Sequence, residues 1–457
     1  MAEKFVNVDR NTPMLLPPDL RDWVPSNHIV HFIIEALDGI EATSAKVNVR
    51  GSGSAQYPPR LMLGLLIYGY ATGRFSSREI ERATHTDVAM RYLAADKHPD
   101  HDTLCAFRRN NAPLVREIFT AVLLTAQELK LLKVGNISID GTKIQANASK
   151  HKAISHKRAC EQIELLESEV SQLMLKAEAA DNKDLADGFT LPGEIALRQH
   201  RLKKLQQARK NIEERLEEQR QQKQAEYEQN LAERAENKAK GKWPRTPPAK
   251  PPSATPSGKE QENFTDPESR IMKVGNGGHF EQSYNAQGAV DADGSLLILG
   301  ARVTNRGNDK QELEPTVASI PQALAPAQTV LCDSGFYSEK QVAAVEAGGV
   351  TTVYAAVRQQ KHRRSLADLA PHQEPEPLGE KAKAIDIMAH RLKTAVGKSL
   401  YGKRKQTVEP VFGIIKETMG FRRFSLRGLS KVNLEWDLVC LAYNFKRLFR
   451  LHQARTA

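Results

Sequence analysis

Three acidic residues stand where the sequence could build one metal site. Asp140 follows the run 134–139, in which β-branched residues alternate, and precedes a glycine, and Asp333 follows the apolar run 328–332 and precedes Ser-Gly. We expect both runs to be short strands that end in a turn. Because the carboxyl ends of central strands in an open α/β sheet collect ligands, adjacent strands would bring both carboxylates into one cleft. Glu409, early in an expected helix, supplies a third acid, and carboxylate oxygens are the ligands that magnesium and manganese prefer.

Basic residues accompany the third acid. Lys416 follows Glu409 by almost two helical turns, so we expect the two side chains on one face of the helix. Several further lysines and arginines lie near Glu409 and Lys416 in the sequence. Such a basic cluster suits a phosphodiester backbone better than a small apolar substrate. The residues that we take as candidates for binding DNA are Tyr401, Arg404, Lys405, Lys416, Arg422 and Arg423.

Each acid alone also has an ordinary structural explanation. Asp-Gly and Asp-Ser pairs after a strand are usually turns. A glutamate in a first helical turn can be there for the helix dipole alone. It is the joint pattern of the three acids that favours a metal site.

The composition is that of a globular protein with an excess of positive charge. The formal net charge of +11 favours a polyanionic partner. The four cysteines have neither metal-ligand nor disulfide-framework spacing, so we expect a reducing cytoplasm. The N-terminus lacks a signal-peptide pattern, and the most apolar stretch, 61–71, is about half the length that crosses a bilayer. No membrane association is therefore expected.

The chain divides into four expected segments. Residues 1–130 are predicted to form a compact helical domain for DNA binding or dimerisation. Residues 131–150 hold the first part of a mixed α/β core, and residues 263–457 hold the remainder with the C-terminal helices. Between them, residues 151–262 carry apolar residues at spacings of three and four, which predicts an antiparallel coiled-coil hairpin. A proline-rich tract follows it over 244–258.

Shorter elements are expected within the last segment. Ala-Asp-Gly separates two apolar-rich runs and favours a hairpin. The expected elements are this hairpin over 283–291 and 295–304, strands over 328–333 and 350–357, a loop over 358–380, and helices over 339–346, 407–419 and 429–451. The fold class is therefore α/β, with a mixed sheet core that a coiled-coil insertion interrupts and an all-α domain precedes.

The motifs together resemble those of the DDE transposases of bacterial insertion sequences. The resemblance covers nearly the whole chain except the insertion and the proline-rich tract. The segments similar to family motifs are 139–148 (IDGTKIQANA, the first aspartate), 331–337 (LCDSGFY, the second aspartate), 408–416 (the glutamate helix), 265–273 and 284–287 (the run into the second and third strands), and 57–70, 76–81 and 99–103 (the helical domain).

This resemblance implies a ribonuclease-H-like catalytic core. Asp140, Asp333 and Glu409 would hold two magnesium or manganese ions, about 4 Å apart. The first step would free a 3′-hydroxyl at the transposon end, and that hydroxyl would then attack target DNA. The expected partners are double-stranded DNA, as terminal inverted repeats and as target, and a second copy of the chain in a homodimer. The expected location is the bacterial cytoplasm.

One motif departs from the family pattern. Many relatives carry a Tyr-Arg-Glu-Lys signature with the arginine four positions before the glutamate. Tyr401, Glu409 and Lys416 fit this signature, but Lys405 occupies the arginine position and Arg404 lies one residue earlier. This shift leaves the three expected metal ligands unchanged. It does affect whether Arg404 can be assigned a specific phosphate contact.

Three other functions remain open at this point. The chain could be a non-catalytic DNA-binding repressor derived from a transposase, although such a protein has no need for all three acids. It could also be a metal-dependent nuclease without joining activity, which a strand-transfer assay would distinguish. A scaffold protein built on the coiled coil would differ from all of these in lacking salt-dependent DNA binding.

Overall fold

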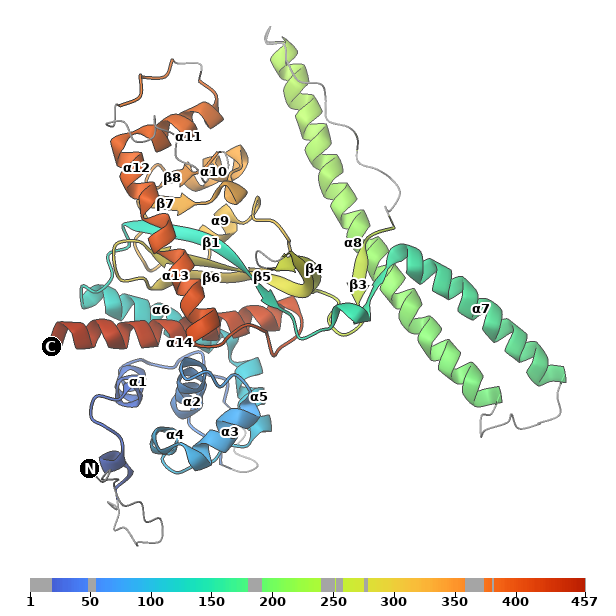
Figure 1. Cartoon of the computed structure of the whole chain (residues 1–457), viewed down its shortest axis with the longest axis horizontal. Coiled ribbons are helices and arrows are strands. Elements are labelled where there is room, and N and C mark those ends of the chain that lie inside the picture. Colours follow the sequence, from blue (N-terminus) through green and yellow to red (C-terminus); the bar gives the residue numbers. More distant parts are fainter. Residues whose placement is uncertain are drawn as a thin grey trace, which may run out of the picture.

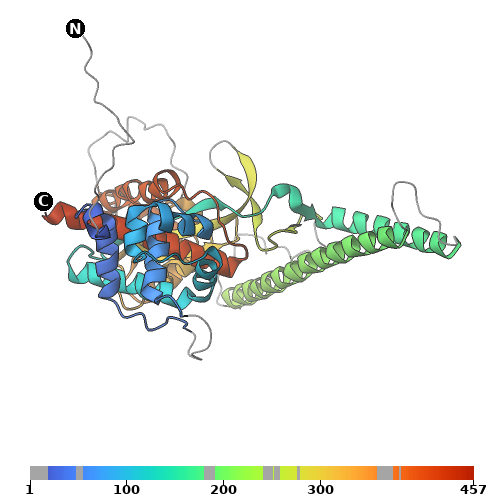
Figure 2. The same ribbon diagram turned by 90° about the horizontal axis from the view of Figure 1, so that it is seen from below.

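The computed structural model describes residues 19–47, 55–179, 191–239, 251, 258–274, 278–357, 374–379 and 382–456. They form a mixed α/β body from which a pair of long helices extends (Figures 1 and 2). Within this described part, no helix combines the length and the apolar character needed to cross a membrane. Most of the predicted proline-rich tract and most of the predicted loop over 358–380 lie outside the described residues.

The N-terminal region is helical, as its sequence predicts. Helix α2 (Pro59–Ala71) has proline in its first turn and is buried along nearly its whole length. At the start of α3 (Ser77–Thr86), the backbone N–H of Ser76 donates to the Glu79 carboxylate at 3.3 Å, which is half of a capping box. The other helices of this region are α1 (Ile29–Asp38), α4 (Val88–Leu93), α5 (His101–Asn110) and α6 (Ala112–Glu128).

A mixed sheet forms the centre of the body. Its strand order is β4-β5-β1-β7-β8, and β6 also pairs with β5. Strand β1 is antiparallel to β5 and parallel to β7, which is itself parallel to β8. The predicted hairpin and the two short buried strands are confirmed. The strands are β1 (Asn136–Gln145), β4 (Arg270–Val274), β5 (His279–Asp291), β6 (Ile298–Thr304), β7 (Thr329–Cys332) and β8 (Thr352–Ala355).

The first strand is longer than its sequence predicts. We expected a turn at Asp140-Gly141, but β1 continues to Gln145 and its backbone pairs with β5 over this whole length. An Asp-Gly pair favours a turn only where no neighbouring strand takes up its backbone hydrogen bonds, and the long β5 does so here. Asp140 therefore lies inside the strand. It stands just beyond the point where the shorter β7 ends, because Ile139 pairs with Cys332, the last residue of β7.

The C-terminal helix joins the sheet to the N-terminal helices. Helix α14 (Leu429–Thr456) packs against β6 and against α1, α2 and α6 (Figure 1). Trp436 is fully buried, and its indole N–H donates to the backbone oxygen of Gln287 at 2.9 Å. Asn444 bonds the backbone N–H and C=O of Ile298 at 2.9 and 2.8 Å. One hydrophobic core therefore runs through the N-terminal helices, the sheet and α14.

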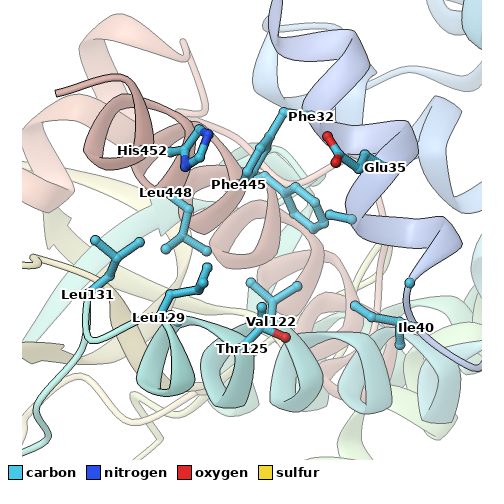
Figure 3. Close-up of a pocket in the computed structure, with 13 residues that line it drawn as sticks. Phe32, Glu35, Ile40, Val122, Thr125, Leu129, Leu131, Phe445, Leu448 and His452 are labelled. Atoms are coloured by element: carbon cyan, nitrogen blue, oxygen red, sulfur yellow. The ribbon is translucent and has the colours of Figure 1, made fainter. Parts of the chain in front are cut away.

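This packing leaves an apolar cavity of about 330 Å³ where α1, α6 and α14 meet. Figure 3 shows Phe32 of α1 and Leu448 and His452 of α14 around it, with Val122 of α6 opposite. The C-terminal helix is thus less tightly packed against α1 and α6 on this side than it is against the sheet.

Two long helices, which we call the arm, interrupt the fold after β1. The contacts of His156 with Glu213 and of Glu169 with Arg198, both at 3.0 Å, show that the helices run antiparallel. Their facing apolar residues, Ile163 among them, form a core cluster separate from that of the body. From residue 218 on, the second helix is exposed nearly throughout. The elements are α7 (His156–Ala179), α8 (Leu191–Ala239), and at the base β2 (Ala153–Ser155) paired with β3 (Gln261–Asn263).

Short helices complete the chain between β6 and α14. The predicted helix over 339–346 is present, whereas α11 and α12 were not predicted, because each is short and Thr394 separates them as a cap. The elements are α9 (Leu313–Val317), α10 (Glu339–Glu346), α11 (Ala384–Lys393), α12 (Ala395–Gly402) and α13 (Val408–Gly413), followed by a π-helical turn (Ile414–Thr418).

Candidate active site

Asp140 lies on β1, and Asp333 directly follows the neighbouring parallel strand β7. Because Ile139 pairs with Cys332, the two aspartates are the next residues of the two segments. Each carboxylate accepts the backbone N–H of the residue that follows it, at 2.8 Å for Asp140 and 2.7 Å for Asp333. These bonds fix both side chains at the carboxyl end of β7, where β1 continues beyond its neighbour. We call this end of the sheet the edge that carries the site.

Glu409 reaches this edge from α13. The ring of Phe412, on the same helix, packs over Gly288, which lies opposite Asp140 in β5. A Cβ at Gly288 would lie only 3.1 Å from Phe412 Cε1, so the missing side chain lets α13 approach the sheet closely. The Glu409 side chain remains half exposed. The helix thus brings the third acid to the face of the sheet on which Asp140 lies.

Arg404 lies among the three acids. Its Nη1 is 3.4 Å from Asp140 Oδ2, and its Nη2 is 3.4 Å from Glu409 Oε1 and 4.0 Å from Asp333 Oδ1. The Arg404 side chain is only 8% exposed, so this charge is held inside the protein. In the part of the chain that the structure describes, no three His, Cys, Asp or Glu side chains form a group that could hold a metal ion. Here the guanidinium stands between the acids.

A break in the helix absorbs the extra residue between the arginine and the glutamate. After α12, a 3₁₀ turn runs over Arg404–Gln406, and Thr407 has φ −109° and ψ −78° before α13 begins. As a result, Arg404 is buried against the acids, whereas Lys405 is exposed. The sequence alone left open which of the two basic residues reaches the site, and in the structure it is Arg404.

The electrostatics of the site leave it negative. Burial raises the pKa of Asp140 to about 6, although the Gly141 N–H and the Arg404 charge both lower it. Burial lowers the pKa of Arg404, but the neighbouring Tyr401 and the acids outweigh this and raise it overall. Burial also raises the pKa of Tyr401 to about 12. One guanidinium does not balance three ionised carboxylates, so the site favours a further cation. A set of carboxylate oxygens fits a hard divalent ion.

A fourth acid, Asp309, lies beside these residues and was missed by sequence analysis. Its Oδ1 accepts hydrogen bonds from Asn285 Nδ2 at 2.7 Å and Gln287 Nε2 at 2.8 Å, and both amide side chains are fully buried on β5. A Cβ at Gly141 would lie 2.8 Å from the same Asp309 oxygen. The acid therefore lies beside Gly141, on the face of β1 opposite to the Asp140 side chain, and its charge still acts on Asp140. It belongs to a loop after β6, and no strand or helix pattern singles it out.

Lys416 lies in a π-helical turn rather than in the regular α-helix that was expected. The face that it was expected to share with Glu409 assumed a regular α-helix, but a π-helical turn begins at Ile414. The N–H of Met419 bonds to the carbonyl of Ile414 at 2.9 Å, five residues back. Seven residues therefore no longer equal two turns. The charged neighbours of Lys416 are Glu417, Lys143 and Arg422.

Arg422 and Arg423 lie at the end of β1. The backbone N–H of Gln145 donates to the carbonyl of Arg422 at 3.2 Å, which attaches this segment to the strand. Arg423 Nη2 donates to Asn147 Oδ1 at 3.1 Å, and Arg422 pairs with Glu417. Both arginines are exposed. They are thus available to a ligand that approaches the carboxyl end of β1.

Two family models match the chain, and both describe transposases. The model "Transposase DDE domain" matches residues 376–449, which include Arg404 and Glu409, and "Transposase domain (DUF772)" matches residues 18–110, which include α1 to α5. The two matches support a DDE transposase of an insertion-element type. Neither match reaches Asp140 or Asp333. No curated protein and no solved structure matches the chain.

The transposase family carries two implications for the site. DDE transposases are generally dependent on divalent metal ions, which agrees with the carboxylate chemistry of the acids. Transposases also bind DNA, and the net charge of +11 agrees with such a partner.

Proposed function

We propose that the chain is an active transposase that cuts DNA at the ends of its element and joins those ends to target DNA. The observation that carries this proposal is the convergence of Asp140, Asp333 and Glu409 from three distant parts of the sequence. Converging carboxylates repel a phosphate backbone, so they would lower the DNA affinity of a protein whose only role was to bind DNA. A catalytic metal site explains them, and a repressor does not.

The arrangement of the strands supports a ribonuclease-H-like core. An antiparallel hairpin, β5 with β6, flanks one side of β1, and the parallel strands β7 and β8 flank the other. We assign residues 131–150 and 263–457 to this core and residues 1–130 to a helical domain. The buried apolar seam between α7 and α8 supports a coiled-coil hairpin for the insertion over 151–262.

Asp140, Asp333 and Glu409 are the residues that would hold magnesium or manganese. When bound, two such ions supply an activated water and stabilise the leaving oxygen of a phosphodiester. The rest of the site belongs to the chain itself. Arg404 partly offsets the charge of the acids while they are close together, and the backbone bonds to Asp140 and Asp333 hold their carboxylates where β7 ends.

Basic residues around this edge would hold the DNA backbone. We propose phosphate contacts for the exposed Arg422 and Arg423, because they lie at the carboxyl end of β1. Lys405 is exposed next to Arg404, and Lys416 lies close enough to Lys143 of β1 for their charges to interact. A homodimer in the bacterial cytoplasm is the form in which we expect the enzyme to act.

The test is cleavage and joining of a labelled duplex that carries the DNA flanking the gene of this chain. We would compare the wild type with Asp140→Asn, Asp333→Asn and Glu409→Gln in magnesium. The matched control is Glu339→Gln, which removes an exposed acid from the first turn of α10. We expect the control to cut and join like the wild type.

The three site variants should bind the duplex and neither cut nor join it. Cutting by the wild type without joining would identify a nuclease instead of a transposase. If the wild type binds the duplex but is as inactive as the variants in both magnesium and manganese, the repressor hypothesis replaces the proposal.

A further inference from the structure

The loop that carries Asp309 is held in place on both sides of the acid. The backbone carbonyl of Asp309 accepts the N–H of Glu312 at 3.0 Å. Glu312 is fully buried and pairs with Arg302 and, at 3.3 Å, with Arg306. On the side-chain side, two amides of β5 donate to Oδ1. The Asp309 carboxylate therefore has a defined position, although it belongs to a loop.

Lys143 is the basic residue that faces this carboxylate. In the β1–β5 register, Lys143 lies opposite Asn285, and Gly141 lies opposite Gln287. Directly opposed residues of an antiparallel pair share a face of the sheet, so Lys143 lies on the same side as the two amides. Its Nζ is 3.8 Å from Asp309 Oδ1, and its side chain is only 19% exposed. Asp140, three residues earlier in the strand, points to the opposite face of β1, but its charge still acts on the ammonium.

The hydrogen bonds of this cluster are incomplete. In the described part of the chain, the buried oxygens Asn285 Oδ1 and Gln287 Oε1 have no hydrogen-bond partner. The distance of 3.8 Å between Lys143 and Asp309 exceeds hydrogen-bond length, so this ion pair leaves the N–H donors of the ammonium available. The two amide oxygens are acceptors and call for a donor, because buried polar groups of a native protein are rarely left unpaired. The ammonium is itself a donor, and beside a DNA-cutting site the acceptor that suits it is an anionic oxygen.

We propose that Lys143 contacts a phosphate oxygen of the DNA strand at the candidate site and that Asp309 is the residue that positions its ammonium. The inference rests on the proposed function, because it needs DNA at this edge of the sheet. Asp309 does not meet the phosphate itself, since two like charges would repel. Its contribution is to hold a flexible lysine in one place before the DNA arrives.

The charges around Lys143 agree with this assignment. Burial lowers the pKa of Lys143 overall, and the charges of Asp309 and Asp140 partly oppose this shift. Lys416 lies close enough for the two lysines to repel each other electrostatically. A phosphate near both would relieve this repulsion. Lys143 and Lys416 would then approach the same stretch of backbone from β1 and from the π-helical turn.

The first test measures binding of the duplex that carries the flanking DNA. All variants are made in the Glu409→Gln background, so that cutting does not interfere, and the affinity is measured between 50 and about 300 mM KCl. Loss of one phosphate contact lowers the slope of log affinity against log salt by about 1. We expect this loss for Lys143→Gln and not for Lys143→Arg. The matched control, Lys133→Gln, removes an exposed lysine just before the other end of β1 and should keep the slope.

The second test addresses the positioning role of Asp309. The effect of Lys143→Gln on the salt slope is measured once with Asp309 present and once in an Asp309→Asn background. If Asp309 positions Lys143, the effect should be much smaller in the Asp309→Asn background. The difference between the two effects is the coupling that a double-mutant cycle measures. Asp309→Glu keeps the charge but lengthens the side chain, and it should show the same reduced coupling. Thermal unfolding of every variant verifies that the fold is intact. A full Lys143→Gln effect in both Asp309 variants would overturn the positioning role.

The outcomes separate this inference from the proposed function. If the Glu409→Gln protein shows no salt-dependent binding to the duplex, the proposed function itself fails. If it binds normally and Lys143→Gln has the same slope as Lys133→Gln, the proposed function stands and the phosphate contact of Lys143 is refuted.

Discussion

The guanidinium of Arg404 lies 3.4 Å from the carboxylate of Asp140, across 264 residues of sequence. The same guanidinium also contacts Glu409 at 3.4 Å. The buried guanidinium of Arg404 therefore links the segment before α13 to the central strand of the sheet. The acids are assembled by the fold itself, and Arg404 supplies the positive charge among them.

Replacing Arg404 should make the stability of the protein depend on divalent ions. In Arg404→Gln the acids repel one another without compensation, and we expect the free energy of unfolding in EDTA to fall by about 2 kcal/mol. Magnesium or manganese should restore much of this loss, because a bound cation replaces the missing charge. Chemical denaturation with and without metal measures both effects.

The control for this prediction is Arg422→Gln. Arg422 pairs with Glu417, and both side chains are about two-thirds exposed, so their ion pair adds little to stability. An equal loss of stability for Arg404→Gln in EDTA and in metal would show that the acids do not share a cation site.

Adding a methyl group at Gly141 should lower both the stability of the protein and its activity, although the methyl group is small. A Cβ there would lie 2.5 Å from Gln287 Nε2 and 2.8 Å from Asp309 Oδ1. We expect Gly141→Ala to lower the free energy of unfolding by about 1–3 kcal/mol and to abolish DNA cleavage, because the polar cluster must move. Gly413→Ala adds the same methyl group to α13, where nothing lies within 4 Å, and should be neutral or slightly stabilising. Similar behaviour of both variants in denaturant would contradict the close approach.

Asp437 should make stability depend on pH. It lies buried on α14 with Arg116, and burial raises its pKa from 3.8 to about 6. Between these values the folded protein binds more protons than the unfolded chain, so the free energy of unfolding decreases as pH rises from about 4 to 6. Asp437→Asn removes this contribution. The stability of the variant relative to wild type should therefore increase across this range, by up to about 3 kcal/mol.

Denaturation of wild type and Asp437→Asn at matched pH values isolates this contribution, since other titrating groups cancel in the difference. A difference that stays constant between pH 4 and pH 6 would mean that Asp437 titrates normally in the folded protein.

The arm should unfold without the body. Ile163 belongs to the core cluster of the arm, which is separate from that of the body. We expect Ile163→Ala to speed hydrogen exchange in α7 and α8 and to leave exchange in β1 and β5 unchanged, because few contacts transmit the change. Exchange followed by mass spectrometry resolves the two regions. Equal loss of protection in β5 would show that arm and body unfold together.

Local sequence patterns predicted most elements but not their extent. The proline start of α2 and the Ala-Asp-Gly turn between β5 and β6 are local signals, and both are confirmed. The Asp140-Gly141 pair was misinterpreted because its conformation depends on β5, which is more than a hundred residues away. The π-helical turn at Ile414 was missed because the sequence there has an ordinary helical pattern.

The candidate site was predictable where its residues carry motifs. Asp140, Asp333 and Glu409 stand next to strand and helix signals, and the structure brings them around Arg404. Asp309 carries no such signal, because its role depends on amides of a neighbouring strand. Such a residue is found only when the tertiary contacts are known.

The order in which the site residues occur along the chain bears on synthesis at the ribosome. Strand β1 is made early, but β5, β7 and α13, which complete its surroundings, follow the whole arm. Helix α14, which packs against both the sheet and the N-terminal helices, is made later still. Pairing over such long separations is slow, and a nascent chain cannot complete it before the last helix emerges. A chain that stops before Glu409 has neither the third acid nor a closed core, so incomplete translation products should be unable to cut DNA.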